Sequence, residues 1–482
     1  MAGLYAAGTR IKTALLLPML AACVNRVVGD SEIVADSFAT VASCPQPLGV
    51  ADAVCGSALV RENWANANSR RIHVAYAVLP ARANPGKRAL FFITGGPGQS
   101  AIEGGKSYLS QMGVLRDSFD FVMVDQRGTG SSRPLRCRVP EGAATEEDME
   151  AGAAACAAQY KDSVDLSQYT TLQAAYDIEA VRRALGYNSI SLDAGSYGTR
   201  VALVYLKHFG NAARAAVLRG VSPTDYRNPL PFPRAGQAAW DSLASRCFAD
   251  PHCRQKYPDL DAHLATVLAR LDRTPVNVSL EEGGKPFKLD RNRFASLLHL
   301  MLFIPSLSAQ LPRILAEAAA GRYDAVASLG SAFEAAVEDQ IYWGMQLAVV
   351  CSEDVPRITE TDIKRETQGT FLGDRMIRDY QAACARWPKA TVPASFYEPT
   401  RSSVPALLIS GAEDPSTPPI LGTAVARGLS NSRHIVVKRA THMGHGECVD
   451  TIVAAFLRLP DPRRLNVRCI DDYQPPPFTY DK

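Results

Sequence analysis

The chain has 482 residues, of which 47% are hydrophobic and 21% charged, as is typical of a globular protein rather than a disordered one. Its 52 Lys and Arg residues against 49 Asp and Glu residues leave a net charge of only +3. Since no long basic run accompanies this balance, the composition argues against nucleic-acid binding.

The first residues are predicted to form a targeting segment rather than part of the fold. Arg10 and Lys12 precede an apolar run over 13–22, which is too short to span a bilayer but suits a secretory signal. The run ends in Leu-Ala-Ala-Cys23, which resembles the lipobox of bacterial lipoproteins. This resemblance implies a signal peptide over 1–22, a lipid on Cys23 and a tether over 23–42. Val24 follows the cysteine in place of aspartate, so the same pattern indicates the outer membrane of the cell envelope; the alternative is a plain signal peptide.

Short apolar runs then alternate with helical patterns. "ALFFITGGPG" (89–98) and "FVMVDQRGTG" (121–130) are each typical of a buried strand that ends in a glycine-rich turn. An amphipathic helix is predicted over 171–186, and strands over 189–196 and 215–221. Strands that alternate with helices indicate a mostly parallel sheet with helices on both faces, here over 43–223.

The alternation stops at about residue 224. Residues 224–400 lack clear strands and contain helical segments such as 260–272, which predicts a helical cap inserted into the α/β domain. A strand with its following loop returns over 404–419 and another over 433–447, and a last helix is predicted over 448–459. We therefore expect residues 401–482 to complete the α/β core.

Ser196 lies between glycines where a predicted strand meets a predicted helix, in "DAGSYG" (193–198). This could be an ordinary tight turn, or a nucleophile elbow that presents the serine hydroxyl at the top of a sheet. Asp414 and His445 each follow a later strand, and Ser, Asp, His is the chain order of α/β-hydrolase triads. Such a serine needs an imidazole to take its proton and a carboxylate to orient that imidazole. Glu413 and His442 are the alternatives to Asp414 and His445.

Backbone N–H groups are needed to stabilise the oxyanion that forms during acyl transfer. Tyr197 follows the proposed nucleophile, and Gly95 and Gly96 in "TGGPG" allow close approach of the backbone to a substrate carbonyl. We therefore expect these three residues to supply the donors.

Five motifs together resemble the proline iminopeptidase and tripeptidyl aminopeptidase family of α/β-hydrolases; they are "TGGPG", "DQRGTGSS", "GSYGT", "GAEDPSTPP" and "GHG". Residues of about 390–475 resemble the tripeptidyl-aminopeptidase-like C-terminal domain. The resemblance implies Ser196, Asp414 and His445 as the catalytic triad, and it implies "DQRGTGSS" as a structural loop. Thr94 and Ala194 depart from it, since the family usually has histidine and glycine there.

Setting Cys23 aside leaves ten cysteines, whose spacing shows no zinc pattern, so we expect no metal and no cofactor. An oxidising compartment would pair them as disulfides, although their number leaves the connectivity open. Neighbours in sequence give five short loops: Cys44–Cys55, Cys137–Cys156, Cys247–Cys253, Cys351–Cys384 and Cys448–Cys469.

Recognition of a peptide's N-terminal ammonium needs acidic groups in a partly dry pocket. Glu353 and Asp354 lie beside Cys351 in the predicted cap, and this matches a cysteine–acid motif of the related exopeptidases. We therefore expect Glu353 to bind the substrate amine, with Asp354 as the other candidate. The sequence predicts an exported serine exopeptidase acting on peptides. The alternatives are a carboxylic-ester hydrolase of the same fold and an inactive peptide-binding lipoprotein.

Overall fold

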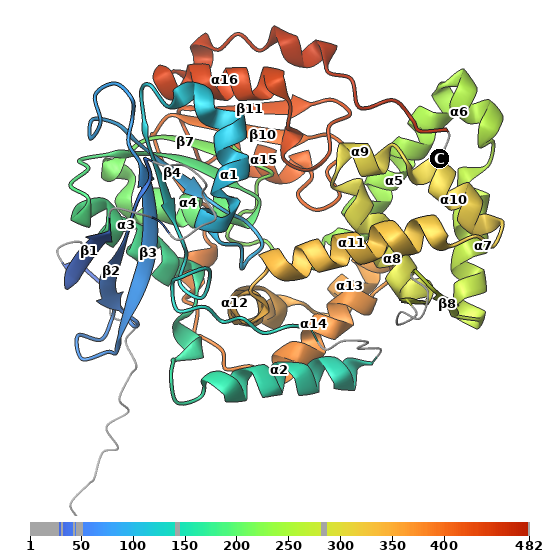
Figure 1. The fold of residues 1–482 in the computed structure, drawn as a ribbon, viewed down its shortest axis with the longest axis horizontal. Helices are drawn as coiled ribbons and strands as arrows, with labels where there is room; N and C mark the ends of the chain where they lie inside the picture. Colours follow the sequence, from blue (N-terminus) through green and yellow to red (C-terminus); the bar gives the residue numbers. More distant parts are fainter. Residues whose placement is uncertain are drawn as a thin grey trace, which may run out of the picture.

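The computed structural model describes residues 28–29, 32–41, 44, 52–139, 145–280 and 287–480. The predicted signal peptide and Cys23 lie outside these residues. The longest strands form a nine-stranded sheet with the order β1-β2-β3-β5-β4-β6-β7-β10-β11, which lies on the left of Figure 1. Strands β1, β2 and β3 pair antiparallel, as do β3 and β5, and the remaining strands are parallel. The mostly parallel sheet predicted from the alternation of patterns is confirmed.

The strands of this sheet are mainly short and apolar. Their bounds are Ser37–Val41 (β1), Val54–Arg61 (β2), Arg71–Leu79 (β3), Ala89–Ile93 (β4), Asp120–Val124 (β5), Ile190–Gly195 (β6), Ala213–Arg219 (β7), Ala406–Gly411 (β10) and Ser432–Val437 (β11). All residues of β5 and β10 are buried, as expected for parallel strands covered on both faces.

Two pairs of helices cover the two faces of the sheet. Residues of α3 (Thr171–Ala184) and α4 (Tyr197–Phe209) share one hydrophobic cluster with the strands. Residues of α1 (Ala101–Met112) and α16 (Glu447–Arg458) share another with the opposite strand faces. The short helix α15 (Pro419–Ala426) lies between β10 and β11 in the chain. Because β4, β6, β10 and β11 run parallel, the loops that follow them meet at one edge of the sheet.

The segment between β7 and β10, here called the cap, is mostly helical, as predicted. Its longer helices are α5 (Phe232–Ala249), α7 (Leu260–Arg273), α8 (Arg291–Leu302), α10 (Leu311–Ala319), α11 (Asp324–Gln340), α12 (Trp343–Val349), α13 (Glu360–Thr367) and α14 (Arg375–Ala385). Short helices α6 (Pro251–Lys256) and α9 (Pro305–Ser308) lie among them. A small antiparallel hairpin of β8 (Val276–Val278) and β9 (Phe287–Leu289) is an element that the sequence patterns did not predict.

The cap has two parts with different packing. Helices α5 to α10 enclose a hydrophobic cluster of their own around Trp240 and Phe294. Residues from Trp343 to Val355, with Cys384, belong instead to the main cluster beneath the sheet. Helix α2 (Glu146–Tyr160), which precedes the cap in the chain, lies beside α14 at the bottom of Figure 1.

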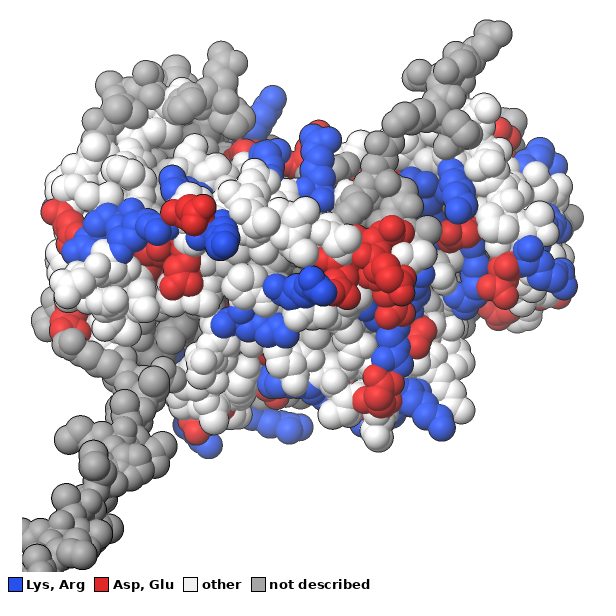
Figure 2. Space-filling view, turned by 90° about the horizontal axis from the view of Figure 1, so that it is seen from below, with Lys and Arg blue, Asp and Glu red and all other residues white. Residues whose placement is uncertain are grey.

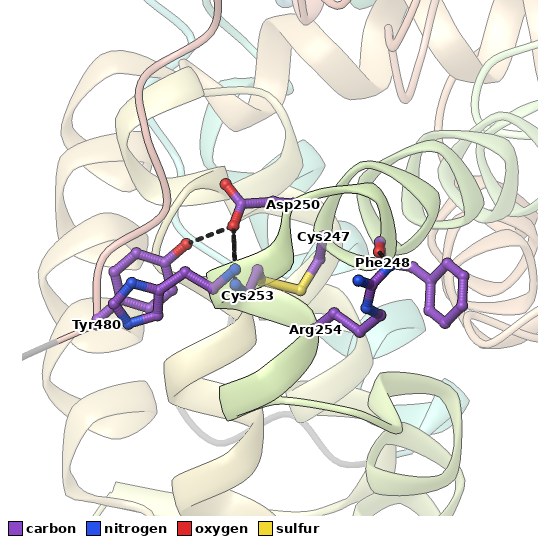
Figure 3. Close-up of a disulfide and its surroundings, with 7 residues drawn as sticks. Cys247, Phe248, Asp250, Cys253, Arg254 and Tyr480 are labelled. Atoms are coloured by element: carbon purple, nitrogen blue, oxygen red, sulfur yellow. Dashed lines mark hydrogen bonds between the residues drawn. A yellow bond between two sulfur atoms is a disulfide. The ribbon is translucent and has the colours of Figure 1, made fainter.

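The C-terminal segment returns from the core to the cap. The hydroxyl of Tyr480 hydrogen-bonds Asp250 Oδ1 at 3.3 Å, beside the disulfide between Cys247 and Cys253 (Figure 3). The Lys256 ammonium donates to the Tyr480 carbonyl at 2.7 Å. The C-terminal segment therefore connects α16 of the core to helices α5 and α6 of the cap.

The structure forms all five of the short disulfide loops between neighbouring cysteines. Such a number of disulfides suggests an exported protein. Figure 2 shows basic and acidic side chains intermixed on the face seen from below, in keeping with the small net charge. Among the described helices, none combines the length and the apolar character needed to cross a bilayer.

Candidate active site

Ser196 lies at the turn between β6 and α4. Its backbone has φ 54° and ψ −128°, a strained conformation for a residue with a side chain. The Ser196 N–H donates to the Arg219 carbonyl at the end of β7, at 2.8 Å. The serine is partly exposed and lines a pocket between the core and the cap. This is the geometry of a nucleophile elbow rather than of an ordinary turn.

The neighbouring glycines make this turn possible. A Cβ atom on Gly198 would lie 2.4 Å from the Ile93 carbonyl oxygen, so no other residue allows α4 to approach β4 so closely. A Cβ atom on Gly195 would lie 2.8 Å from Met443 Sδ, in the loop after β11. Ala194, where the family pattern has glycine, is buried within β6.

The glycine-rich loop after β4 touches the serine turn. A Cβ atom on Gly95 would lie 2.9 Å from Ser196 Cβ, and Gly96 has φ +104°. Thr94 holds the loop by donating its hydroxyl hydrogen to the Gln99 carbonyl at 2.8 Å. Tyr197 is the first residue of α4, so its N–H has no partner within the helix. The N–H groups of Gly95 and Gly96 thus lie on the loop that touches Ser196, and the N–H of Tyr197 lies at the helix end that follows it.

Asp414, in the loop after β10, is bound to a histidine. His442 Nδ1 donates to Asp414 Oδ2 at 2.8 Å. The same carboxylate accepts from the N–H groups of Ser416 and Thr417, at 2.9 and 2.8 Å, and from the Thr417 hydroxyl at 2.8 Å. Burial raises the pKa of Asp414, but His442 and these hydrogen bonds outweigh it and hold the pKa below its usual value.

The expectation that His445 lies on Asp414 is wrong, and His442 takes that place. The loop after β11 crosses directly over Gly411, where a Cβ atom would lie 1.8 Å from the Thr441 carbonyl oxygen. His442 is the first residue after this crossing, so its ring meets the loop after β10. The His445 Nδ1 atom is buried without a hydrogen bond to any described residue, and burial, with Arg219 and His442, lowers its pKa to about 4.

Glu413, the alternative acid, faces away from the histidine. Its carboxylate lies 3.7 Å from the guanidinium of Arg246 on α5, in a separate cavity. Asp414 is therefore the carboxylate that orients the imidazole. Because Asp414 occupies Nδ1 of His442, Nε2 is the nitrogen that can exchange a proton with a hydroxyl.

The pocket at Ser196 has a volume of only about 20 Å³ and includes one cap acid. Asp354 lines it together with Tyr226, Asn228 and Phe232. Burial raises the pKa of Asp354 to about 7, in spite of the Arg200 guanidinium 3.0 Å from Oδ1. The Asp354 Oδ1 atom makes no hydrogen bond to the described residues.

Glu353, which we expected to bind a substrate amine, does not line this pocket. Its Oε1 accepts from the Thr171 N–H at 2.7 Å, and its Oε2 from the Thr171 hydroxyl at 2.6 Å and Arg200 at 3.2 Å. The side chain is fully buried. Helix α12 continues into a π-helical turn over Val350–Asp354, which turns the two adjacent acids in different directions. Glu353 therefore has a structural role beneath the pocket, whereas Asp354 faces the pocket.

Arg200 is a residue that sequence reasoning missed. It lies one helical turn after Ser196, is 1% exposed, and bonds both Glu353 and Asp354. A charged residue directly before the apolar run "VALVYL" (201–206) of α4 could have signalled this buried ion cluster, since a buried charge requires partners.

Comparison with known proteins agrees with this architecture. The family model for the alpha/beta hydrolase fold matches residues 88–297, and that for TAP-like proteins matches residues 369–469. The chain is an α/β hydrolase with a TAP-like C-terminal region. Its fold and these matches identify it as an enzyme of the serine hydrolase class.

Several curated proteins resemble this hydrolase. Serine protease Hip1 of Mycobacterium tuberculosis is 25% identical over 463 residues, covering 86% of this chain and 87% of Hip1. Proline iminopeptidase of Neisseria meningitidis is 29% identical over 138 residues, covering 29% of this chain and 34% of the relative. Tripeptidyl aminopeptidase of Streptomyces coelicolor is 28% identical over 187 residues, covering 35% of each.

Proposed function

We propose that this α/β hydrolase is an exported serine exopeptidase, which cleaves peptide bonds near a free N-terminus. The observation that carries the proposal is that Ser196 and Asp354 line one pocket, so that a peptide whose ammonium meets Asp354 brings its first residues to the nucleophile. Relatives named as a serine protease and as aminopeptidases support peptides as the substrate class.

In the proposed reaction, Ser196 is the nucleophile and His442 is the general base. His442 Nε2 takes the serine proton as Oγ attacks the peptide carbonyl, and Asp414 stabilises the imidazolium. The N–H groups of Tyr197 and of Gly95 or Gly96 stabilise the oxyanion. The imidazolium then gives its proton to the leaving amine, and water hydrolyses the acyl-enzyme by the same path in reverse.

Asp354 is the proposed amine anchor. The carboxylate is fully buried and carries a pKa of about 7, so a proton and a substrate ammonium compete for it near neutral pH. Asn228 lines the same pocket and offers an amide oxygen as a second acceptor for an ammonium. The carboxylic-ester alternative lacks any use for this acid, which favours peptides.

We further propose that the enzyme is exported and held to the membrane by a lipid on Cys23. The five disulfides support an oxidising compartment, and the lipobox-like sequence before Cys23 supports the anchor.

The test uses the mature protein without its anchor. Aminoacyl, tripeptidyl and N-acetylated p-nitroanilides are compared with p-nitrophenyl acetate, for the wild type and Ser196→Ala. The proposal expects faster hydrolysis of the anilides with a free amine than of the acetylated ones, loss of turnover in Ser196→Ala, and labelling of Ser196 by a fluorophosphonate. Turnover that persists in Ser196→Ala would refute the mechanism, and equal rates with free and acetylated anilides would refute the exopeptidase assignment.

A further inference from the structure

The end of cap helix α8 contacts both loops that carry the proposed acid and base. His299 Nε2 lies 3.0 Å from the carbonyl oxygen of Pro415, the residue after Asp414. The hydroxyl of Thr441, the residue before His442, donates to the Phe303 carbonyl at 2.8 Å. One short stretch of the cap, from His299 to Phe303, is thus bonded beside each of the two catalytic groups.

Aromatic contacts continue this link from the pocket to the catalytic histidine. Phe232, which lines the pocket at Ser196, has its ring centroid 5.4 Å from that of His299. His299 lies edge-on to Phe303 at 5.2 Å, and Phe303 lies edge-on to His442 at 5.1 Å. Packed rings transmit displacement because protein interiors are close-packed.

The local chain is adapted to hold His299 in this position. A Cβ atom on Gly236, in the second turn of α5, would lie 2.8 Å from His299 Cδ2. Glycine is a poorer helix former than alanine, so this close approach of the two helices has an energetic cost. His299 is 1% exposed, and burial lowers its pKa to about 4, against the Pro415 bond and nearby Asp414. The ring is therefore neutral at pH 7, and Nε2 carries the hydrogen that the Pro415 carbonyl accepts.

We propose that His299 is a positioning residue of the cap, which holds the loops of Asp414 and His442 in the geometry that activates Ser196. The core alone supplies the three catalytic side chains, and the seated cap completes their alignment. This inference rests on the triad in the proposed function. It adds that the reactivity of Ser196 depends on contact between the cap and the catalytic loops. His299 itself touches neither substrate nor the reacting atoms in this arrangement.

The test measures the rate at which a fluorophosphonate labels Ser196 in the full chain, because this rate reports serine activation without assuming a natural substrate. His299→Leu removes the donor, and His299→Gln keeps an N–H at a similar reach. His263→Leu, in α7 of the cap and away from the catalytic loops, is the matched control. We expect labelling at least tenfold slower in His299→Leu, within about threefold of the wild type in His299→Gln, and unchanged in His263→Leu.

The pH profile separates positioning from general packing. A looser bond between Asp414 and His442 stabilises the imidazolium less, so the acid limb of the labelling rate should move to lower pH in His299→Leu. An acid limb at the wild-type position, or a rate within twofold of the wild type, would overturn the inference. An equal loss in the Leu and Gln variants would also overturn it.

A second variant and the labelling of the wild type keep the inference testable. If His299→Leu does not fold, Phe303→Leu removes only the ring against His442, and at least threefold slower labelling is expected; an unchanged rate would overturn the inference. A wild type that is not labelled at Ser196 would overturn the triad of the proposed function and this inference with it. Normal labelling of both wild type and His299→Leu would overturn only the inference.

Discussion

Replacement of Asp354 by Asn tests the amine anchor most directly. The substitution keeps the volume of the side chain but removes the charge that faces the pocket at Ser196. An ammonium left without its buried partner costs about 2 kcal/mol or more, which is roughly a 30-fold loss of kcat/KM. We expect this loss for aminoacyl anilides with a free amine. N-acetylated anilides and p-nitrophenyl acetate lack the ammonium, so their kcat/KM should change little.

The pH dependence follows from the raised pKa of Asp354. Below about pH 7 the carboxyl is protonated and cannot pair with an ammonium. About half of it is ionised at pH 7 and about a tenth at pH 6. Wild-type kcat/KM for free anilides, divided by that for acetylated ones, should therefore fall about fivefold between pH 7 and pH 6. Any group of the triad that affects both reactions cancels in this ratio. Asp354→Asn should abolish the acid limb of the ratio. It should also flatten the limb above pH 7.7–8.0, because that limb arises from loss of the substrate ammonium that pairs with Asp354.

Glu353→Gln is the matched control for this experiment. Glu353 bonds Thr171 and Arg200 beneath the pocket, so its loss should lower stability and affect free and acetylated substrates equally. Asp354→Asn has the opposite effect on stability. Because the folded pKa is raised, wild-type stability falls as pH rises from about 4 to about 7, and the Asn variant should lack that fall and have the higher Tm at pH 8. An unchanged ratio of free to acetylated kcat/KM in Asp354→Asn would refute the anchor.

Three other predictions address the catalytic triad, the packing of the fold and the lipid on Cys23. His442→Ala should lower kcat by three or more orders of magnitude, while His445→Ala should retain most activity in the same anilide assay, and the reverse order would contradict the geometry at Asp414. Gly198→Ala should lower the free energy of unfolding by about 1–3 kcal/mol because its Cβ would meet the Ile93 carbonyl. Gly113→Ala, whose Cβ would meet nothing within 4 Å, should be nearly neutral in the same denaturant titration. Cys23→Ser should abolish labelling of the full chain by a fatty-acid analogue in cells, and an unlabelled wild type would show that Cys23 carries no lipid.

Much of the core could be predicted because its signals are local. An apolar run followed by a glycine-rich turn specifies a buried strand and the sharp exit after it, as at "ALFFITGGPG" and at Ser196. Pairing of cysteines with their sequence neighbours also follows from short loops, which close easily. The hairpin of β8 and β9 was not predicted because each strand is three residues long, too short to show an alternating pattern.

The acids of the cap could not be assigned from sequence. Glu353 and Asp354 are adjacent, and the difference between them arises from the π-helical turn and from Arg200, 153 and 154 residues away in the chain. A two-residue acidic motif predicts that one carboxylate faces the site. Both carboxylates pair with Arg200, and only the packing against α4 decides that Asp354 also lines the pocket while Glu353 bonds Thr171 beneath it.

The position of the histidine follows from backbone contact rather than from its sequence neighbours. His445 lies between glycines, in a loop that could reach over the sheet, so the sequence predicts it as the partner of Asp414. The structure uses Gly444 and Gly446 differently: both have positive φ, and they turn the chain into α16 after His442 has met Asp414. The deciding contact lies at Gly411, where the loop after β11 passes over the end of β10. Cap residue Phe303 then receives the hydroxyl of Thr441 at that same crossing. The histidine is thus fixed by one glycine of the core and one carbonyl of the cap, which is why its reactivity should depend on both.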